Sequence, residues 1–319
     1  MNPLYLTEAD VVATFSMHDA LTVVENAARA LGEGRAENKP RQRAFTPASV
    51  IQVLAASYGD RMGHKTYTVA PKGRGARFWV TLFDASGEML AIIEADALGQ
   101  IRTGAASGVA TRFLAREDAK TLGIIGTGWQ ARSQLEACFH VRPFTRVLVY
   151  GRDQARREAF CEEMSEKLGA GIVPVGTAAE AAAEADVLCT MTSASLPVFD
   201  GAHLKRGTHV NAAGSNRANA QEIDVETVRR AKVIAVEDLA QAQVESGDLL
   251  AAEREGAFAW ERVVRLSDVV AGKAPARTSE DDITLFESLG IGLWDVAAAA
   301  HVYATCVTEG RGARLPIPG

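Results

Sequence analysis

The chain has 319 residues, of which 47% are hydrophobic and 23% charged, and this composition excludes a mainly disordered or fibrous protein. Lysine and arginine total 34 against 40 acidic residues, so the formal net charge is −6 and no global basic field favours nucleic acid or an anionic membrane as partner. A small anionic substrate needs only one or two local cations and therefore stays compatible with this balance. The length suggests two domains.

The cysteines and the first residues indicate the compartment. The four cysteines lie far apart, form no CxxC pair and are Cys138, Cys161, Cys189 and Cys306. The opening residues lead directly to acidic positions rather than to a signal peptide, and no apolar run approaches the roughly 18–20 residues that span a bilayer. We therefore expect a reduced, cytoplasmic protein.

The first part of the chain predicts a small mixed α and β unit. Residues 7–10 can cap a helix, residues 17–31 show apolar side chains at helical spacing, and residues 38–47 are polar and interrupted by proline, which predicts a loop. Four β-rich runs follow, with a hairpin turn at 85–88 between the last two; they are 50–56, 63–69, 78–84 and 89–94. Strands this close together predict an antiparallel sheet packed by a helix.

Near residue 97 the pattern changes to alternating helices and strands. An alanine-rich helix at 98–114 leads into a buried strand at 122–125. Further helices are predicted at 130–139, 155–168 and 178–185, and further strands at 147–150, 172–175, 187–190, 209–212 and 233–236. This alternation predicts a parallel sheet with helices on both faces. Beyond residue 283, Leu285, Phe286 and an alanine-rich helix at 292–306 could fold back on the first unit.

A glycine-rich turn joins the strand at 122–125 to the following helix. Gly126 would permit the tight turn, Gly128 would let the backbone approach a pyrophosphate, and Ala131 would permit close packing of helix and strand. The alternative is a plain glycine turn. We expect a dinucleotide to bind at Gly126, Thr127, Gly128, Trp129 and Gln130.

The end of the next strand bears on the choice of cofactor. An acidic residue there would bind the ribose hydroxyls of NAD, whereas this chain has Arg152 followed by Asp153. Because guanidinium binds phosphate bidentately, NADP(H) is favoured over NAD(H), although Asp153 could still serve NAD and Arg152 could be a solvated loop charge. Thr192 and Ser193 follow a later strand, on the carboxyl edge where such sheets hold ligands.

Three basic residues of the first unit are candidates for binding a substrate carboxylate. Arg41 lies in a loop, Lys65 on a strand, and Arg102 near the start of a helix, where a cation opposes the helix dipole unless an anion lies beside it. Each could instead be an ordinary exposed charge. The sequence has no HExxH, CxxC or GxSxG motif, which argues against a metal site and an α/β-hydrolase triad.

The chain resembles the ornithine cyclodeaminase/mu-crystallin family over nearly its full length. Four motifs in the same order carry this resemblance, namely residues 101–106 (IRTGAA), 121–131 (TLGIIGTGWQA), 207–214 (GTHVNAAG) and 282–290 (DITLFESLG). The resemblance implies a Rossmann domain over 109–292 and a discontinuous α+β substrate domain over 1–108 and 293–319, through which two copies form a homodimer. It also places Ser288 at the cofactor.

In that family a first-domain lysine and two arginines contact the substrate, and Lys65, Arg102 and Arg41 occupy the matching positions, with Arg43 a near rival of Arg41. Two departures disfavour deamination with cyclisation. Asn216 stands where the cyclodeaminases carry an aspartate, and it cannot act as a base. A cyclodeaminase glutamate aligns with Gln52.

These observations predict an NAD(P)H-dependent reductase that converts a small α-imino acid to an L-amino acid. Arg41 and Arg102 would hold the carboxylate, Lys65 would orient it and assist proton transfer, and Asn216 would bond near the substrate nitrogen. The imine could be cyclic, as in pyrroline-2-carboxylate, or acyclic, as in iminosuccinate. The alternatives are a cyclodeaminase with tightly bound NAD and a non-catalytic ligand-binding protein like mu-crystallin.

Overall fold

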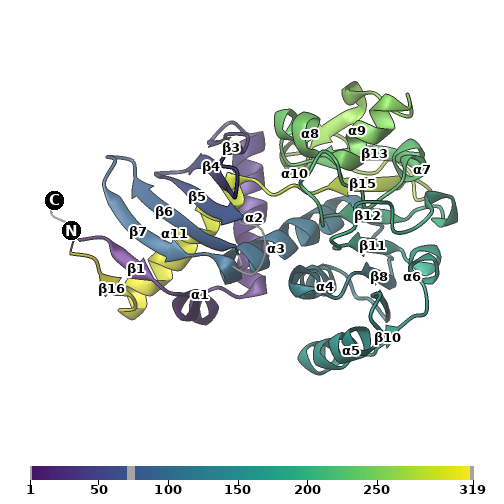
Figure 1. Ribbon diagram of the computed structural model, residues 1–319, viewed down its shortest axis with the longest axis horizontal. Helices are drawn as coiled ribbons and strands as arrows, with labels where there is room; N and C mark the ends of the chain where they lie inside the picture. The colour runs from purple at the N-terminus through teal and green to yellow at the C-terminus, as the bar shows by residue number, and fades with distance from the viewer. Residues whose placement is uncertain (1, 70–75, 317–319) are drawn as a thin grey trace. The chain divides into compact units, whose positions relative to one another are not determined.

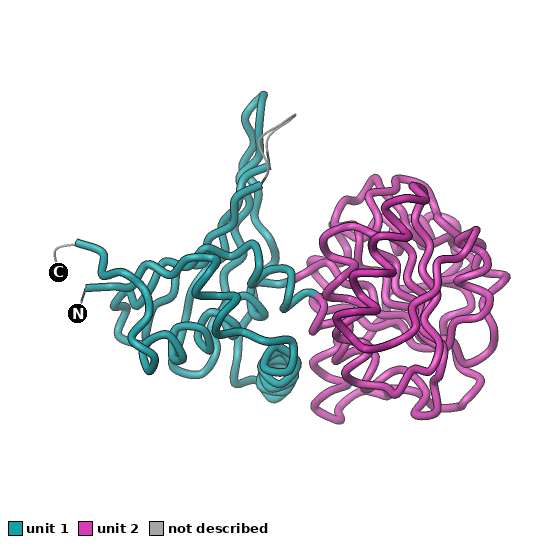
Figure 2. The backbone as a smooth tube through the Cα atoms, turned by 90° about the horizontal axis from the view of Figure 1, so that it is seen from below, with its two compact units in different colours: residues 1–103, 291–319 teal, residues 104–290 magenta. Residues whose placement is uncertain are grey.

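The computed structural model describes residues 2–69 and 76–316, and the chain divides into two compact units (Figure 2). Unit 1 comprises Met1–Thr103 and Ile291–Gly319, and unit 2 comprises Gly104–Gly290. The family resemblance predicts these boundaries at 108/109 and 292/293. The first boundary of the structure lies inside helix α3 (Asp96–Leu114), which is therefore one continuous helix shared by the two units.

Unit 1 is a mainly antiparallel sheet with helices against it (Figure 1). The strand order is β16-β1-β7-β6-β5-β4-β2, with β3 also paired to β4, and among the described strands of this sheet only β1 and β7 run parallel. The strands are β1 (Leu4–Leu6), β2 (Ala36–Asn38), β3 (Gln42–Phe45), β4 (Val50–Tyr58), β5 (Arg61–Val69), β6 (Arg77–Asp84), β7 (Met89–Glu94) and β16 (Ala313–Arg314). The helices are α1 (Glu8–Thr14), α2 (Met17–Gly32) and α11 (Gly292–Glu309).

Local sequence explains where α1 and α2 begin. Thr7 and Asp10 form a reciprocal capping box at α1, and Ser16 and Asp19 form another at α2. The loop predicted at 38–47 is wrong in part, because Gln42–Phe45 pairs with β4 as strand β3. Its residues are mostly exposed, so this edge strand lacks the alternation of apolar and polar side chains that would have indicated it.

The register of the sheet decides which side chains face α11. Leu54, Lys65 and Val80 lie side by side on β4, β5 and β6, and all three are buried. Helix α11 packs across these strands with α2 beside it. Because side chains alternate along a strand, Val53 and Trp79 lie on the opposite face, where they are only half-buried.

Unit 2 is a wholly parallel sheet with the order β10-β9-β8-β11-β12-β15-β13-β14. Its strands are β8 (Thr121–Ile125), β9 (Arg146–Tyr150), β10 (Ile172–Pro174), β11 (Val187–Thr190), β12 (His209–Ala212), β13 (Ala231–Val236), β14 (Val263–Arg265) and β15 (Ile283–Glu287). Its helices, besides the second half of α3, are α4 (Trp129–Val141), α5 (Gln154–Leu168), α6 (Ala178–Glu184), α7 (Val225–Arg230), α8 (Leu239–Glu245), α9 (Gly247–Arg254) and α10 (Leu266–Val270).

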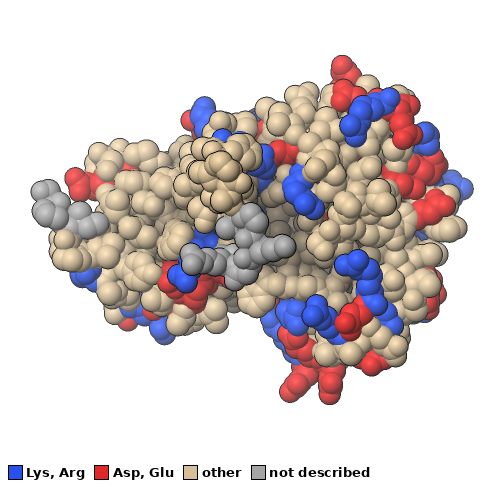
Figure 3. Space-filling view, in the orientation of Figure 1, with Lys and Arg blue, Asp and Glu red and all other residues tan. Residues whose placement is uncertain are grey.

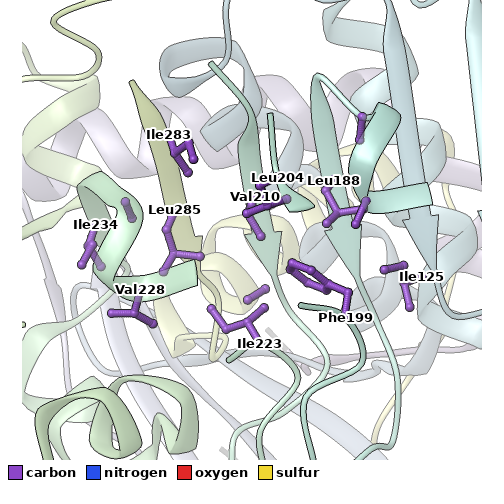
Figure 4. Packing of buried hydrophobic residues seen from close by; sticks show 14 of the residues in the cluster. Ile125, Leu188, Phe199, Leu204, Val210, Ile223, Val228, Ile234, Ile283 and Leu285 are labelled. Carbon is purple, nitrogen blue, oxygen red and sulfur yellow. The ribbon is translucent and has the colours of Figure 1, made fainter. Parts of the chain in front are cut away.

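Both faces of the parallel sheet are covered, so its strands are buried on both sides. Ile124 belongs to the core formed with α4 and α5, whereas its neighbour Ile125 belongs to the core formed with α6 and α7 (Figure 4). This is the doubly wound Rossmann-type fold that the sequence predicts. The expectation that Leu285 and Phe286 fold back on the first unit is wrong, because both lie in β15, between β12 and β13. Their continuous apolar run is typical of an interior parallel strand.

The surface charge and the length of the helices are relevant to whether the chain binds a polyanion or crosses a membrane. Basic and acidic side chains are interspersed over the face displayed in Figure 3, as the near balance of charges predicts. Across residues 2–69 and 76–316, every helix is too short or too polar to traverse a lipid bilayer.

Candidate functional site

The first glycine of the loop between β8 and α4 is required by the fold itself. Gly126 has a φ of +119°, which side chains rarely tolerate, and a Cβ there would lie 2.1 Å from the carbonyl oxygen of Met191. Its N–H donates to the carbonyl oxygen of Tyr150 at 2.8 Å. Gly126 therefore holds the ends of β8, β9 and β11 close together.

The second glycine of this loop is not required by contacts within unit 2. Gly128 is the N-cap of α4 with a φ of −83°, and a Cβ built on it meets no atom within 4 Å among the described residues. Packing within unit 2 therefore does not demand glycine there, whereas close approach of a pyrophosphate to the helix N-terminus would. Trp129 is half-exposed and Gln130 partly buried in the first turn of the same helix.

The end of β9 packs directly against this loop. A Cβ on Gly151 would lie 2.7 Å from Thr127 Oγ1, so glycine at 151 permits the contact. Arg152 is exposed. Asp153 is the N-cap of α5, and its carboxylate accepts the N–H of Arg156 at 3.0 Å. The acidic residue at this strand end is thus engaged in capping a helix, while the neighbouring arginine faces solvent.

The other predicted cofactor residues follow strands at the same carboxyl edge. The strand order reverses between β8 and β11, which is the switch point where such sheets bind ligands. The loop after β11 contains Thr192 and Ser193, and that after β12 contains Asn216. Ser288, directly after β15, is buried, and its hydroxyl donates to Glu237 Oε1 at 3.2 Å.

Unit 1 brings Lys65 and Arg102 together on one buried carboxylate. Asp295 Oδ1 accepts from Lys65 Nζ at 3.0 Å and from Arg102 Nε at 2.9 Å, and all three side chains are buried. Lys65 comes from β5, Arg102 from α3 and Asp295 from the first turn of α11. Gly99 leaves room for the lysine, because a Cβ there would lie 2.8 Å from Lys65 Nζ.

The cluster carries more positive than negative charge. Burial lowers the pKa of Lys65 from 10.5 to about 8, Asp295 opposes this shift, and the charges of Arg102 and Arg41 add to it. Arg102 Nη1 and Asp295 Oδ2 are buried, and no described residue hydrogen-bonds either atom. A buried guanidinium N–H without an acceptor is costly, so the site fits a ligand that brings an anionic oxygen.

The structure also separates the two rival arginines. Arg41 is buried and its charge acts on Lys65. Arg43 donates from Nε to Gln52 Oε1 at 3.3 Å, and the same oxygen accepts the hydroxyl of Tyr67 at 2.9 Å. The structure thus groups Arg41 with the cation cluster, and Arg43 with Gln52.

Asp295 is a residue of this cluster that the sequence motifs do not identify. The available signal was a single carboxylate within the mostly apolar, alanine-rich run at 292–306. Such a residue on a buried helix is expected to have a cationic partner. Nothing in the local sequence identifies that partner, because Lys65 and Arg102 are 230 and 193 residues away.

A cavity of about 740 Å³ in unit 2 is a poor candidate for a ligand site, although four arginines line it. Arg277 donates to the carbonyl oxygens of Leu114, Gly207 and Asp282, and Arg142 donates to those of Arg112 and Arg116. These guanidinium groups therefore satisfy backbone carbonyls, several of them at the C-terminal end of α3. Within the described ranges, no group of three or more His, Cys, Asp and Glu residues is arranged to hold a metal ion.

A family model, similar sequences and similar solved structures all relate the chain to the same group of proteins. The model of the ornithine cyclodeaminase/mu-crystallin family matches residues 1–310. A Δ1-pyrroline-2-carboxylate reductase of Bacillus cereus (strain ZK / E33L) is 39% identical over 274 residues, covering 84% of each chain. An alanine dehydrogenase of Archaeoglobus fulgidus is 32% identical over 325 residues, covering 99% of this chain and 98% of the relative.

Solved structures give the same picture. Δ1-Pyrroline-2-carboxylate reductase of Thermococcus litoralis, in complex with NADH and L-proline, superposes with a TM-score of 0.93 at 34% identity, covering 98% of this chain and all of the other. An archaeal alanine dehydrogenase dimer with bound NAD gives 0.94 at 31% identity, with full coverage of both chains. The iminosuccinate reductase of Paracoccus denitrificans with NAD⁺ gives 0.92 at 27% identity, covering 99% of this chain and 100% of the other.

Proposed function

Because the chain belongs to the ornithine cyclodeaminase/mu-crystallin family and is an NAD(P)-dependent oxidoreductase of carbon–nitrogen bonds, we propose that it reduces Δ1-pyrroline-2-carboxylate to L-proline. The observation that carries this proposal is the buried cation cluster of Lys65 and Arg102 on Asp295, with an Arg102 N–H directed to no acceptor among the described residues. The cyclic imine is preferred over iminosuccinate because the pyrroline-2-carboxylate reductases are the more similar relatives.

The residues of unit 1 would bind and orient the imine. Arg102 and Arg41 would hold its single carboxylate, and protonated Lys65 would orient it and assist transfer of a proton to the nitrogen. Asn216 of unit 2 would hydrogen-bond near that nitrogen. When bound at the carboxyl edge of unit 2, the reduced nicotinamide supplies the hydride. We assign substrate binding to unit 1 and cofactor binding to unit 2.

The direct test is oxidation of NADPH or NADH, followed by absorbance, with a panel of imines. The panel contains pyrroline-2-carboxylate, piperideine-2-carboxylate, iminosuccinate, and pyruvate with ammonia. We expect the five-membered cyclic imine to give the highest kcat/KM and L-proline as product. A flat trace across the panel at high enzyme concentration would refute the proposal, and ammonia release from ornithine without net cofactor turnover would establish a cyclodeaminase instead.

We further propose that NADPH is the preferred reductant. Arg152 is exposed at the end of β9 while Asp153 is engaged as the N-cap of α5, so a 2′-phosphate has a cation to bind there. Arg152→Ala is expected to weaken NADPH binding about 10-fold, the loss of one charge-assisted contact, and to leave NADH binding unchanged. Fluorescence titration measures both dissociation constants.

Arg156→Ala is the matched control, because Arg156 is also exposed and lies four residues further on. It should change neither dissociation constant. Tighter binding of NADH than NADPH by the unaltered protein would show that the cofactor is NAD(H), as in the solved relatives.

Gly128→Ala is expected to weaken cofactor binding about 10-fold without lowering the melting temperature, because the added methyl meets only the space in front of α4. Titration with the reduced cofactor and thermal unfolding without it give the two readings. The control is Gly171→Ala, at another glycine whose Cβ has open space, and both readings should stay as in the unaltered protein. Unchanged affinity in Gly128→Ala would contradict the assignment of this loop.

We propose that the face of the unit 1 sheet opposite α11 is covered by a second copy of the chain. Apolar side chains are exposed to solvent along it and at its edge, including Phe45, Ile51 and Met62. The dimeric state of a solved alanine dehydrogenase supports this. Met62→Glu is expected to shift the sedimenting species from dimer to monomer, while Val244→Glu, at an exposed apolar residue of unit 2, should not. A monomer for the unaltered chain would disprove the proposal.

A further inference from the structure

One buried carboxylate joins the loops that follow β11 and β12. Glu222 Oε1 accepts the N–H of Thr192 at 2.6 Å, and its Oε2 accepts the N–H of Gly214 at 2.6 Å. The hydroxyl of Thr190 also donates to Oε2, at 3.1 Å. Both loops begin at the carboxyl edge of the sheet, and the first contains Thr192 while the second contains Asn216.

The backbone around Glu222 is itself fixed. Its carbonyl oxygen accepts the N–H of Val198 at 2.9 Å, which ties the far end of the first loop to the same residue. Asp248 Oδ1 accepts the N–H groups of Glu222 and Ile223 at 2.8 and 3.1 Å. Glu222 is thus held in place by its own backbone hydrogen bonds, and its side chain hydrogen-bonds both loops.

The glycine at 214 is explained by this carboxylate. A Cβ on Gly214 would lie 2.3 Å from Glu222 Oε2, so only glycine lets the chain pass this closely over the acid. Burial raises the pKa of Glu222, while its hydrogen-bond donors lower it. Because every partner of its two oxygens is a donor, the geometry requires an acceptor at both ends of the carboxyl group.

We propose that Glu222 is a positioning residue for the cofactor, which sets the conformation of residues 191–200 and 213–221 by accepting one backbone N–H from each loop. This inference rests on the proposed function, since those loops matter only if a dinucleotide binds at this edge. An amide cannot replace the carboxylate, because its NH₂ group would face the N–H of either Thr192 or Gly214.

The test is the Glu222→Gln variant, with NADPH and NADH binding measured by fluorescence titration in the absence of imine. We expect both dissociation constants to rise about 10-fold, as one loop loses its anchor. In steady-state assays the KM for the cofactor should rise by a similar factor, and the KM for the imine should rise as well, because Asn216 lies in one of the two loops. A purely structural role would lower the melting temperature and leave the cofactor affinity of the folded protein unchanged.

Asp186→Asn is the matched control, a buried acid changed to its amide just before β11, at the edge of the sheet opposite the two loops. The backbone N–H groups of Lys120 and Thr121 both bond Oδ2 of Asp186, so asparagine can keep them and cofactor affinity should stay within about twofold. If Glu222→Gln fails to fold, Glu222→Asp replaces it, because the shorter side chain keeps the charge but cannot reach both loops. Normal affinity in the variant overturns this inference alone, whereas an unaltered protein that binds neither cofactor overturns the proposed function with it.

Discussion

Arg102→Met is expected to lower kcat/KM for the cyclic imine by about 1,000-fold, because truncating one partner of a buried charge pair costs about 2–5 kcal/mol. The guanidinium of Arg102 is buried, bonded through Nε to Asp295, and has Nη1 without a described acceptor. Methionine keeps an unbranched side chain of comparable reach. The loss should therefore come from the missing charge and donors. Most of it should appear in KM for the imine.

Arg61→Met is the control for this prediction. Arg61 lies on β5, the strand that carries Lys65, and pairs with the largely exposed Asp60. Such surface pairs contribute little, so kcat/KM should change less than about twofold. Cofactor affinity of Arg102→Met, measured by titration, should equal that of the unaltered protein. If the variant keeps more than about a tenth of the activity, Arg102 does not hold the carboxylate.

The second large effect concerns Lys65. Lys65→Met is expected to lower kcat by about 100- to 10,000-fold, the range for loss of a positioned proton donor. In the unaltered enzyme, burial lowers the pKa of Lys65 from 10.5 to about 8, so the side chain is charged below pH 8 and neutral above it. If the cation is the active form, kcat/KM falls as pH rises through about 8. A profile of kcat/KM against pH, from pH 6 to 10, measures this fall.

Asp295→Asn identifies the group that titrates. Asp295 favours the charged form of Lys65, so its removal lowers the pKa of Lys65 further and the fall in kcat/KM should begin at a lower pH. Thr66 is next to Lys65 on the opposite face of β5, and Thr66→Val should not change the pH at which kcat/KM falls. A profile that is flat to pH 10, or that Asp295→Asn does not shift, would show that Lys65 does not act as the cation.

The sequence predicts the parallel sheet and its glycine loop well because both depend on local patterns. A continuous apolar strand such as β8, followed by Gly126 and Gly128 and then a helix, is recognisable within a dozen residues. Edge strand β3 was not recognisable, since its mostly exposed residues carry no alternating pattern. Its pairing comes from β4, not from its own side chains.

The buried carboxylates Asp295 and Glu222 could not be predicted from the sequence, for a different reason. Asp295 and Glu222 each act through partners brought together by the fold, and Glu222 lies 30 residues beyond the Thr192 amide it accepts. A buried acid and a surface acid look alike in sequence until the burial of their elements is known. The departure of Asn216 and Gln52 from the cyclodeaminase pattern was visible only through the family resemblance.

The two glycines of the β8–α4 loop differ in what their loss would do inside a cell. A side chain at Gly126 strains the backbone and collides with Met191, so such an allele lowers the amount of folded protein that escapes degradation. An added methyl at Gly128 meets no described atom, so under the proposed assignment of this loop that allele yields a normal amount of folded protein with weakened cofactor binding. If the chain is dimeric, only the second allele supplies folded, weakly active subunits that can pair with fully active ones, and only that allele would be dominant.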